Sequence, residues 1–387
     1  MRICATLLLV WGIAVPGMAQ GPPSVENVET FQRPRLHSDA DTNSWESYFD
    51  FGVAQLREHP KVAAAAFAWS SRLDPSRAEP LIGRWVAYWM VYPGWFEDYV
   101  ADRRDVIESP AVVRLDSLFL RALIRNPLVP RNLVVLAFDQ LPGEWRTDRY
   151  TQAVLTSAAG HYEEAARSFS TLIRSDSVKH VRVRWDLALC FTANRQYDSA
   201  AAEITALLAE MRRQELKRLT YSYDSRELLE YSLGLLASAR GDQQGAREAM
   251  GRALVENLAF YPAHVALGEL AMASGDTATT LAEYAQAAEL AQADGVVHAR
   301  YGEALALLGH IADAEPELRQ AIALEPFYAR PHFMLAAVLE ARGQTSAALA
   351  EYRTFVDHAP KEMPLANTAR QRIAALTASL GDSTKRP

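Results

Sequence analysis

Glycine recurs at a fixed interval in the C-terminal half of this chain. Four glycines are equally spaced, namely Gly241, Gly275, Gly309 and Gly343. A fixed period of roughly 20 to 50 residues is the signature of a chain built from stacked structural repeats. The chain has 387 residues, which is longer than one compact hydrophobic core usually is. The period therefore predicts a solenoid, in which each unit packs mainly against its neighbours.

A wider pattern of large and small residues accompanies these glycines. Seven residues before them, a large residue is followed by a small one, in Leu233-Gly234, Leu267-Gly268, Tyr301-Gly302 and Leu335-Ala336. Five residues after them comes another small residue, in Ala246, Thr280, Ala314 and Ala348. Small residues at such points let neighbouring helices approach closely. This pattern resembles the tetratricopeptide repeat (TPR), a helix-turn-helix unit of about 34 residues. The resemblance implies an all-α solenoid, a right-handed superhelix that ends in a C-terminal capping helix.

The phase of the pattern also divides the chain into segments. Together with local composition, the phase predicts the following segments: a signal peptide at 1–19, a flexible linker at 20–43, a degenerate N-terminal TPR-like region at 44–145, two units at 146–214, four phase-locked units at 227–362, a capping helix at 363–380 and a disordered tail at 381–387. The regular spacing of the repeats is interrupted near 93–110 and near 210–226. Insertions into a repeat array often adjust a binding face. A tolerated insertion without a function is the other interpretation.

The first residues have the pattern of a secretory signal peptide. Arg2 precedes a short apolar run, and Gly17-Met18-Ala19 forms a small-x-small cleavage site. The run is too short for a membrane-spanning helix, which takes about 20 residues. We therefore expect an exported mature protein without a membrane span, located in the periplasm or outside the cell of a bacterium. After cleavage Cys190 is the only cysteine, so we expect no internal disulfide.

The sequence lacks the motifs of common catalytic, metal and nucleotide sites. It has no Gly-rich phosphate loop, no H-E-x-x-H, no paired cysteines and no G-x-S-x-G. The formal net charge of -7 argues against a general polyanion binder, because such proteins usually carry a basic stripe. We expect no enzymatic activity, no cofactor, no metal and no nucleic-acid partner.

Three histidines, His264, His298 and His332, recur at the same interval as the glycines. Equivalent positions in adjacent repeats lie farther apart than the ~8–10 Å of one helix contact. Ligands of one zinc ion must all lie ~2 Å from it. The resemblance implies a large aromatic residue at this position. We therefore interpret the three histidines as packing residues and not as metal ligands.

The resemblance also implies which residues face a partner. In tetratricopeptide proteins the first helix of each unit faces the concave groove, and its fifth position commonly contacts the ligand. Carried over to this sequence, that position holds, among others, Tyr150, Trp185, Tyr231 and Phe333. The predicted groove also includes Glu269 and Glu303, at the ninth position, and Glu340, which lies beyond Phe333 on the same helix. Aromatic residues are favoured interface anchors, so we predict an extended peptide partner with apolar anchors and some basic character. The alternative is that some of these rings pack between helices.

The predicted function is a non-enzymatic scaffold or adaptor that binds a protein or peptide in its concave groove. Two alternatives stay open. The chain could be a structural component of a cell-envelope complex, acting through its convex face or the insertion near 93–110. It could instead carry a catalytic or carbohydrate-binding site in its irregular N-terminal third. That third is rich in aromatic residues, but the helical spacing of Trp85, Tyr88, Trp89 and Tyr92 favours core packing.

Overall fold

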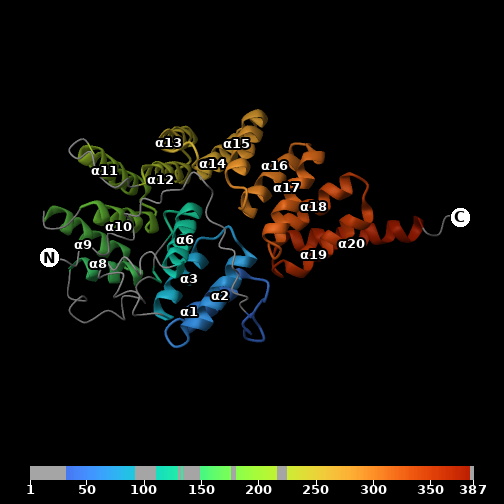
Figure 1. Cartoon of the computed structure of the whole chain (residues 1–387), viewed down its shortest axis with the longest axis horizontal. Coiled ribbons are helices and arrows are strands. Elements are labelled where there is room, and N and C mark those ends of the chain that lie inside the picture. The colour runs from blue at the N-terminus through green and yellow to red at the C-terminus, as the bar shows by residue number, and fades with distance from the viewer. Residues whose placement is uncertain are drawn as a thin grey trace. The chain divides into compact units, whose positions relative to one another are not determined.

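A computed structural model of the chain describes residues 32–91, 110–129, 132–133, 149–175, 180–215 and 225–383. These residues form 17 α-helices and no β-strand (Figure 1). The prediction of an all-α helical repeat fold is therefore confirmed. The predicted signal peptide at 1–19 and nearly all of the predicted insertion near 93–110 lie outside the described residues. None of the helices in the described ranges combines the length and the apolar character that crossing a bilayer requires.

Contacts between residues divide the described chain into two compact units. The first unit takes in Val53–Ala64 and Leu81–Ala263, as far as these are described. The second unit takes in the described parts of Gln20–Gly52, Ala65–Pro80 and His264–Pro387. The second unit thus joins residues near the N-terminus to the last repeats of the chain.

The first unit contains three helix pairs of the repeat type. They are α8 (Arg149–Ala158) with α9 (Tyr162–Arg174), α10 (His180–Ala193) with α11 (Tyr197–Glu215), and α12 (Arg226–Ala239) with α13 (Gln243–Glu256). Each of these helices packs on its neighbours along the chain, as in a solenoid. Two helices precede the pairs, α3 (Glu79–Val91) and α6 (Pro110–Arg125). Trp85 of α3 is buried, and its ring centroid lies 5.1 Å from that of Phe119 in α6.

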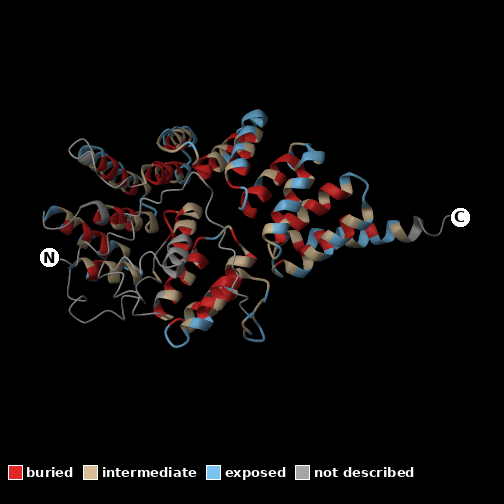
Figure 2. Ribbon diagram, viewed as in Figure 1, coloured by how far each residue is buried: buried red, intermediate tan, exposed pale blue. Residues whose placement is uncertain are grey.

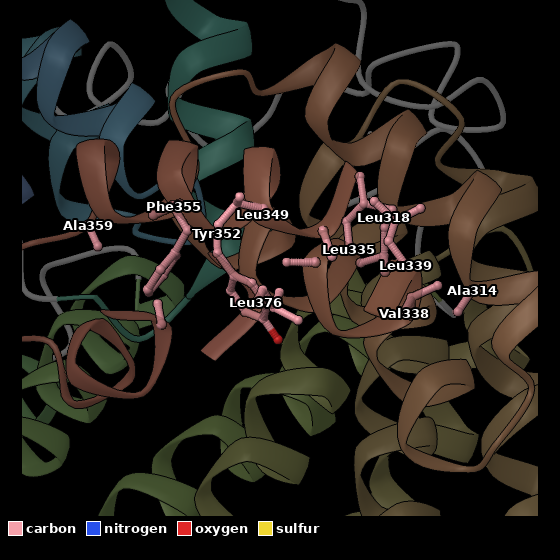
Figure 3. Packing of buried hydrophobic residues seen from close by; sticks show 14 of the residues in the cluster. Ala314, Leu318, Leu335, Val338, Leu339, Leu349, Tyr352, Phe355, Ala359 and Leu376 are labelled. Carbon is pink, nitrogen blue, oxygen red and sulfur yellow. The ribbon is translucent and has the colours of Figure 1, made fainter. Parts of the chain in front are cut away.

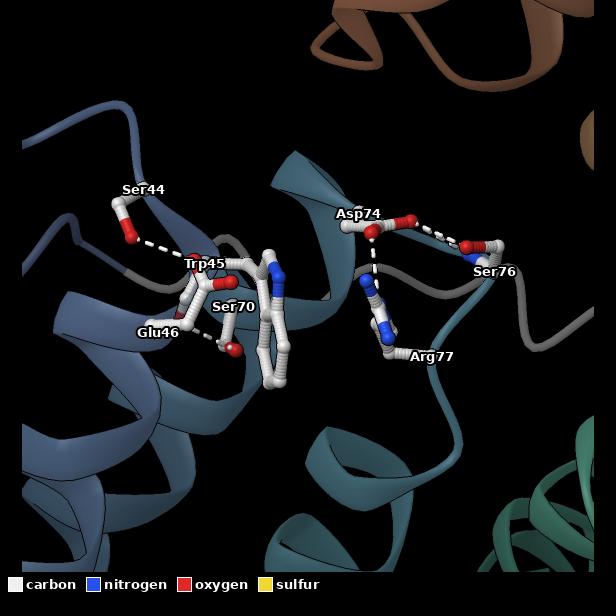
Figure 4. Close-up of polar contacts among 7 residues, drawn as sticks. All are labelled: Ser44, Trp45, Glu46, Ser70, Asp74, Ser76 and Arg77. Atoms are coloured by element: carbon white, nitrogen blue, oxygen red, sulfur yellow. Dashed lines mark hydrogen bonds and ion pairs between the residues drawn. The ribbon is translucent and has the colours of Figure 1, made fainter. Parts of the chain in front are cut away.

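The second unit contains an N-terminal helix pair and the last repeats. Its helices are α1 (Trp45–Gln55), α2 (Pro60–Leu73), α14 (Tyr261–Ala273), α15 (Thr277–Leu290), α16 (Gly295–Leu307), α17 (Ile311–Leu324), α18 (Ala329–Ala341), α19 (Thr345–His358) and α20 (Pro364–Ser383). Residues 53–55 of α1, 60–64 of α2 and 261–263 of α14 are grouped with the first unit. Leu318, Leu335 and Phe355 belong to one buried cluster that α17, α18 and α19 share with α20 (Figure 3). In the N-terminal pair, the Ser70 hydroxyl donates to the Trp45 carbonyl over 2.8 Å (Figure 4).

The repeated turn glycines have a left-handed backbone. Gly241, Gly275, Gly309 and Gly343 have φ angles of 78°, 77°, 85° and 73°. A residue with a Cβ pays about 1–2 kcal/mol in this conformation, which explains why glycine recurs there. The α10–α11 turn has no glycine, and Arg195 adopts a φ of 57° in its place.

Close contact between helices explains the second set of small residues. A Cβ added to Gly302 of α16 would lie 2.7 Å from Cγ of Leu318 in α17. Gly234 faces Met250 and Gly268 faces Tyr284 in the same way. The small residues on the second helices, Ala246, Thr280, Ala314 and Ala348, are fully buried (Figure 2). Both sets of recurring small residues, those in the turns and those between the helices, therefore have a steric cause.

The ends of the second unit differ from the predicted boundaries. Helix α20 runs to Ser383 instead of 380, and residues 384–387 of the predicted tail lie outside the described residues. Its buried Ala366, Ala369 and Leu376 pack on the cluster of the last repeat, which is the covering role expected of a cap. Residues 33–43 of the predicted flexible linker contact α2 and the end of α19. Their polar side chains bind backbone groups that helix ends leave without a partner.

Candidate interaction surface

The four predicted groove aromatics all take part in packing between helices. Trp185 is buried in the cluster between α10, α11 and α12. Tyr231 is buried with its ring edge on Phe260, at a centroid distance of 5.4 Å. Tyr150 and Phe333 are partly buried, and the Tyr150 hydroxyl lies 2.5 Å from a carboxylate oxygen of Asp186. The rings therefore follow the packing alternative in this structure, and contact with a partner stays a prediction.

The three predicted groove glutamates each pair with an arginine farther along the chain, which belongs to the next repeat for Glu269 and Glu303 and to the capping helix α20 for Glu340. Glu269 of α14 binds Arg300 of α16 over 2.5 Å. Glu303 of α16 accepts two hydrogen bonds from Arg330, at the start of α18, over 2.6 and 3.0 Å. Glu340 of α18 accepts from Nε of Arg372 in α20 over 3.1 Å. These six residues form a charge ladder along the first helices of the repeats.

All three arginines of this charge ladder are half-exposed, and so is Glu269, whereas Glu303 and Glu340 are more buried. The side chains of Arg300, Arg330 and Arg372 are 43%, 47% and 46% exposed. Those of Glu303 and Glu340 are only 18% and 21% exposed. Exposed ion pairs contribute only about 0–1 kcal/mol to stability. A guanidinium has five N–H donors, so an arginine already bound to one carboxylate can still bind a second anion.

A second polar ladder joins the two helices within each repeat. His264, His298 and His332 each place Nδ1 2.7 Å from a carboxylate oxygen on the second helix, with Glu283, Glu317 and Glu351 as the respective partners. These glutamates recur at the same interval as the histidines, in the same three repeats. That recurrence was the signal in the sequence that could have predicted the pairs. His298 and His332 are buried between helices and His264 is partly buried, in line with the packing interpretation, but each histidine also has a specific polar partner.

The middle pair, His298 with Glu317, couples the stability of the fold to pH. Burial lowers the pKa of His298, but the hydrogen bond and the charge of Glu317 outweigh burial and leave this pKa above its ordinary value. The Gln292 carbonyl, 3.1 Å from Nε2, acts in the same direction. A histidine whose pKa is raised by folding stabilises the fold fully below its unfolded pKa of about 6.5. That contribution is lost as the pH rises through the raised pKa.

Comparison with known families gives this repeat pattern a name. The family model described as "Tetratricopeptide repeat" matches residues 150–214 and 301–362. The chain carries tetratricopeptide repeats. The matched segments are the α8–α11 region of the first unit and the α16–α19 region of the second. No curated protein matches the chain in sequence.

Several solved TPR structures are similar to this chain at low identity. YrrB, described as a TPR protein with an unusual peptide-binding site, is 17% identical with a TM-score of 0.41. The match covers 53% of this chain and 99% of YrrB. MamA is 21% identical with a TM-score of 0.36, over 38% of this chain and 85% of MamA. The Cut9–Hcn1 hetero-tetramer of the APC/C is 17% identical with a TM-score of 0.45, over 86% of this chain and 63% of that chain.

The second break in the TPR phase contains a buried charged group that sequence analysis did not anticipate. Glu230 of α12 is buried, and it accepts from Nη2 of Arg212 over 3.2 Å and from Nε of Arg252 over 2.8 Å. Arg212 lies on the part of α11 that overruns the usual length. That helix has 19 residues, whereas α13 has 14. The overrun therefore supplies one of the two cations that compensate a buried carboxylate in these TPR units.

Cys190 is a packing residue of the TPR core. It is fully buried on α10, and its Sγ lies 3.4 Å from the Ser157 hydroxyl. Burial raises the pKa of the Cys190 thiol to about 11, so the thiolate is scarce at neutral pH. This agrees with the interpretation of Cys190 as a small structural residue.

Proposed function

We propose that this chain is a non-enzymatic protein-interaction scaffold whose partner binds along the charge ladder of the second unit. The observation that carries the proposal is the row of half-exposed arginines on α16, α18 and the capping helix α20. An extended segment lying across the first helices would meet them in turn. The pattern at residues 1–19 supports binding outside the cytoplasm.

The ion pairs change the expected chemistry of the partner. The glutamates alone favour a basic peptide, but each one is already neutralised by an arginine. A basic partner would have to displace these arginines. A partner carboxylate can bind the free edge of a guanidinium and leave the Glu–Arg pair in place, because a guanidinium presents donors in a fork. We therefore propose a partner segment with acidic side chains, in addition to the apolar anchors expected from the sequence.

Binding to matched acidic and basic peptides tests the proposal. Purified chain would be titrated with peptides that share an aromatic anchor and differ only in carrying Asp and Glu or Lys and Arg. We expect the acidic set to bind more tightly and to weaken with salt, because exposed charges are screened within about 8 Å at physiological ionic strength. The double variant Arg300→Gln with Arg330→Gln should lose most of this binding, by about tenfold or more if each contact contributes about 1 kcal/mol.

Arg319→Gln provides the matched control. Arg319 is 52% exposed and pairs with Glu315, but it lies on the second helix α17. Helix content and melting temperature of both variants would be compared with those of the unchanged chain. A preference for the basic peptides, or an equal loss in the Arg319 variant, would show that the ladder is not the binding face.

A further inference from the structure

A polar segment near the N-terminus is fastened to the end of the last repeat. We call residues 33–44 the strap. The Asn43 amide donates to the carbonyls of Asp357 and Ala359 over 2.8 and 3.3 Å. The Asp41 carboxylate accepts from the backbone N–H of Lys361 over 2.7 Å. The strap therefore satisfies backbone groups at the C-terminus of α19, which a helix end leaves without intrahelical partners.

A row of rings lies beside these bonds. The Trp69 ring of α2 meets the Phe327 ring edge-on at 5.0 Å, and Phe327 lies 5.7 Å from the His358 ring. His358 in turn lies 5.6 Å from His332. The Arg33 guanidinium lies 4.8 Å from the Trp69 centroid, so the strap contacts the first ring of the row.

The two histidines at the end of this row have unpartnered nitrogens. His332 binds Glu351 through Nδ1, but its Nε2 is buried without a hydrogen-bond partner. Nδ1 of His358 is likewise buried without a partner. A neutral imidazole carries a proton on only one of its two ring nitrogens, so the other nitrogen needs no acceptor. A protonated imidazole has two N–H donors, so protonation of His358 would bury a charged donor that no acceptor reaches.

The charged groups around His358 act mostly against its protonation. Burial lowers the pKa of His358 most, followed by the neighbouring His332; the Arg33 guanidinium lowers it too. Only Asp357 acts in the opposite direction. Glu351 on α19 is engaged by His332. Arg33 is a residue of the strap, so the strap itself opposes a proton on His358.

We propose that the strap is a clasp that stays closed while His358 is neutral and opens when His358 takes up a proton. Opening separates Arg33 from the new charge and gives water access to Nδ1. The open form then binds the proton more tightly than the closed form. Opening therefore becomes more favourable as the pH falls below the ordinary histidine pKa of about 6.5, by at most about tenfold per pH unit for a single proton.

Hydrogen exchange of the full chain tests this clasp. The Lys361 amide is the direct reporter, because it is bonded to Asp41 only when the clasp is closed. After correction for the intrinsic pH dependence of exchange, we expect its protection to fall several-fold, and by at most about tenfold, from pH about 7.5 to about 5.5. Carboxylic acids ordinarily titrate near pH 4, so this range spares them. Amides within α12 and α13, two helices that contain no histidine, serve as an internal reference and should keep their protection.

Three variants separate the clasp from general acid sensitivity. His358→Gln should keep the Lys361 amide protected across the whole range, because glutamine cannot take up the proton. His37→Gln, at the one histidine of the strap, should leave the pH response unchanged. Asn43→Ala should expose the amide at every pH. The proposal is overturned if the unchanged chain shows no pH response, a result that needs no variant to fold, or if the His358 variant responds like the unchanged chain.

Discussion

The turn within each repeat requires a left-handed backbone conformation, which favours glycine. Arg195 is the residue that occupies this turn position in place of glycine. It has a φ of 57° in a turn where five equivalent positions hold glycine. The arginine side chain gains nothing from this backbone conformation, which costs a residue with a Cβ about 1–2 kcal/mol. Glycine would remove that strain but would also increase the entropy of the unfolded chain.

We therefore predict that Arg195→Gly stabilises the chain by about 0.5–1 kcal/mol, the part of the strain that the entropy of glycine does not offset. The midpoint of urea unfolding, followed through the helix signal, measures the change. Gly241→Ala is the reciprocal control in an equivalent turn, where φ is 78°, and should destabilise the chain. A lower midpoint for the Arg195 variant would contradict the prediction.

At the same scale, the burial and pairing of the predicted groove residues depend on neighbouring side chains that no local sequence pattern reveals. Trp185 and Tyr231 have the position expected of groove residues, yet both rings are buried. Glu269 and Glu303 also have that position, and each is paired with an arginine from the next repeat. The sequence identified a face of the first helices. It could not show which side chains on that face reach solvent.

At the scale of the helix pair, close packing between the two helices decides which positions can hold a Cβ. A Cβ at position 302 of α16 would meet Leu318 of α17 at 2.7 Å for Cγ and 3.2 Å for the backbone nitrogen. The backbone atom cannot rotate away as a side chain would, so the two helices would have to separate. Gly251, on α13, has no atom within 4 Å of an added Cβ.

The two glycines should respond to alanine with opposite signs. We predict that Gly302→Ala costs about 1–3 kcal/mol, the usual penalty of overpacking. Gly251→Ala should stabilise by about 0.5–1 kcal/mol, because alanine favours a helix more than glycine does. Unfolding by urea measures both. If Gly302→Ala were neutral, α16 and α17 would be able to separate at little cost, and close packing would not explain the glycine.

At the scale of the whole molecule, each repeat is stabilised partly by its interfaces with the neighbouring elements. Helix α20 buries Ala366, Ala369 and Leu376 against the cluster that includes Tyr352 and Phe355 of α19. In a solenoid the stability of one repeat depends on its own contacts and on the interfaces with adjacent repeats. The last repeat should therefore be the one that depends most on α20.

We predict that removing residues 364–387 makes the amides of α18 and α19 exchange at least about tenfold faster, because the lost interface contributes more than about 1.4 kcal/mol. The amides of α8 to α11 in the first unit should keep their protection. Hydrogen exchange followed by mass spectrometry resolves the two regions. An equal loss of protection in both regions would mean that the chain unfolds as one cooperative block and not repeat by repeat.

The sequence by itself determined the repeat, its helices and the places where glycine or another small residue is required. These features are set by backbone conformation and by contacts between helices adjacent in the chain, so they recur once in every repeat and can be counted. Only the tertiary structure decided which rings are buried, that the glutamates of the first helices are neutralised, and that the strap is fastened to α19. Asn43 and Asp357 are 314 residues apart in sequence. Their contact depends on how the N-terminal helix pair packs on the last repeats, and no periodic pattern records that.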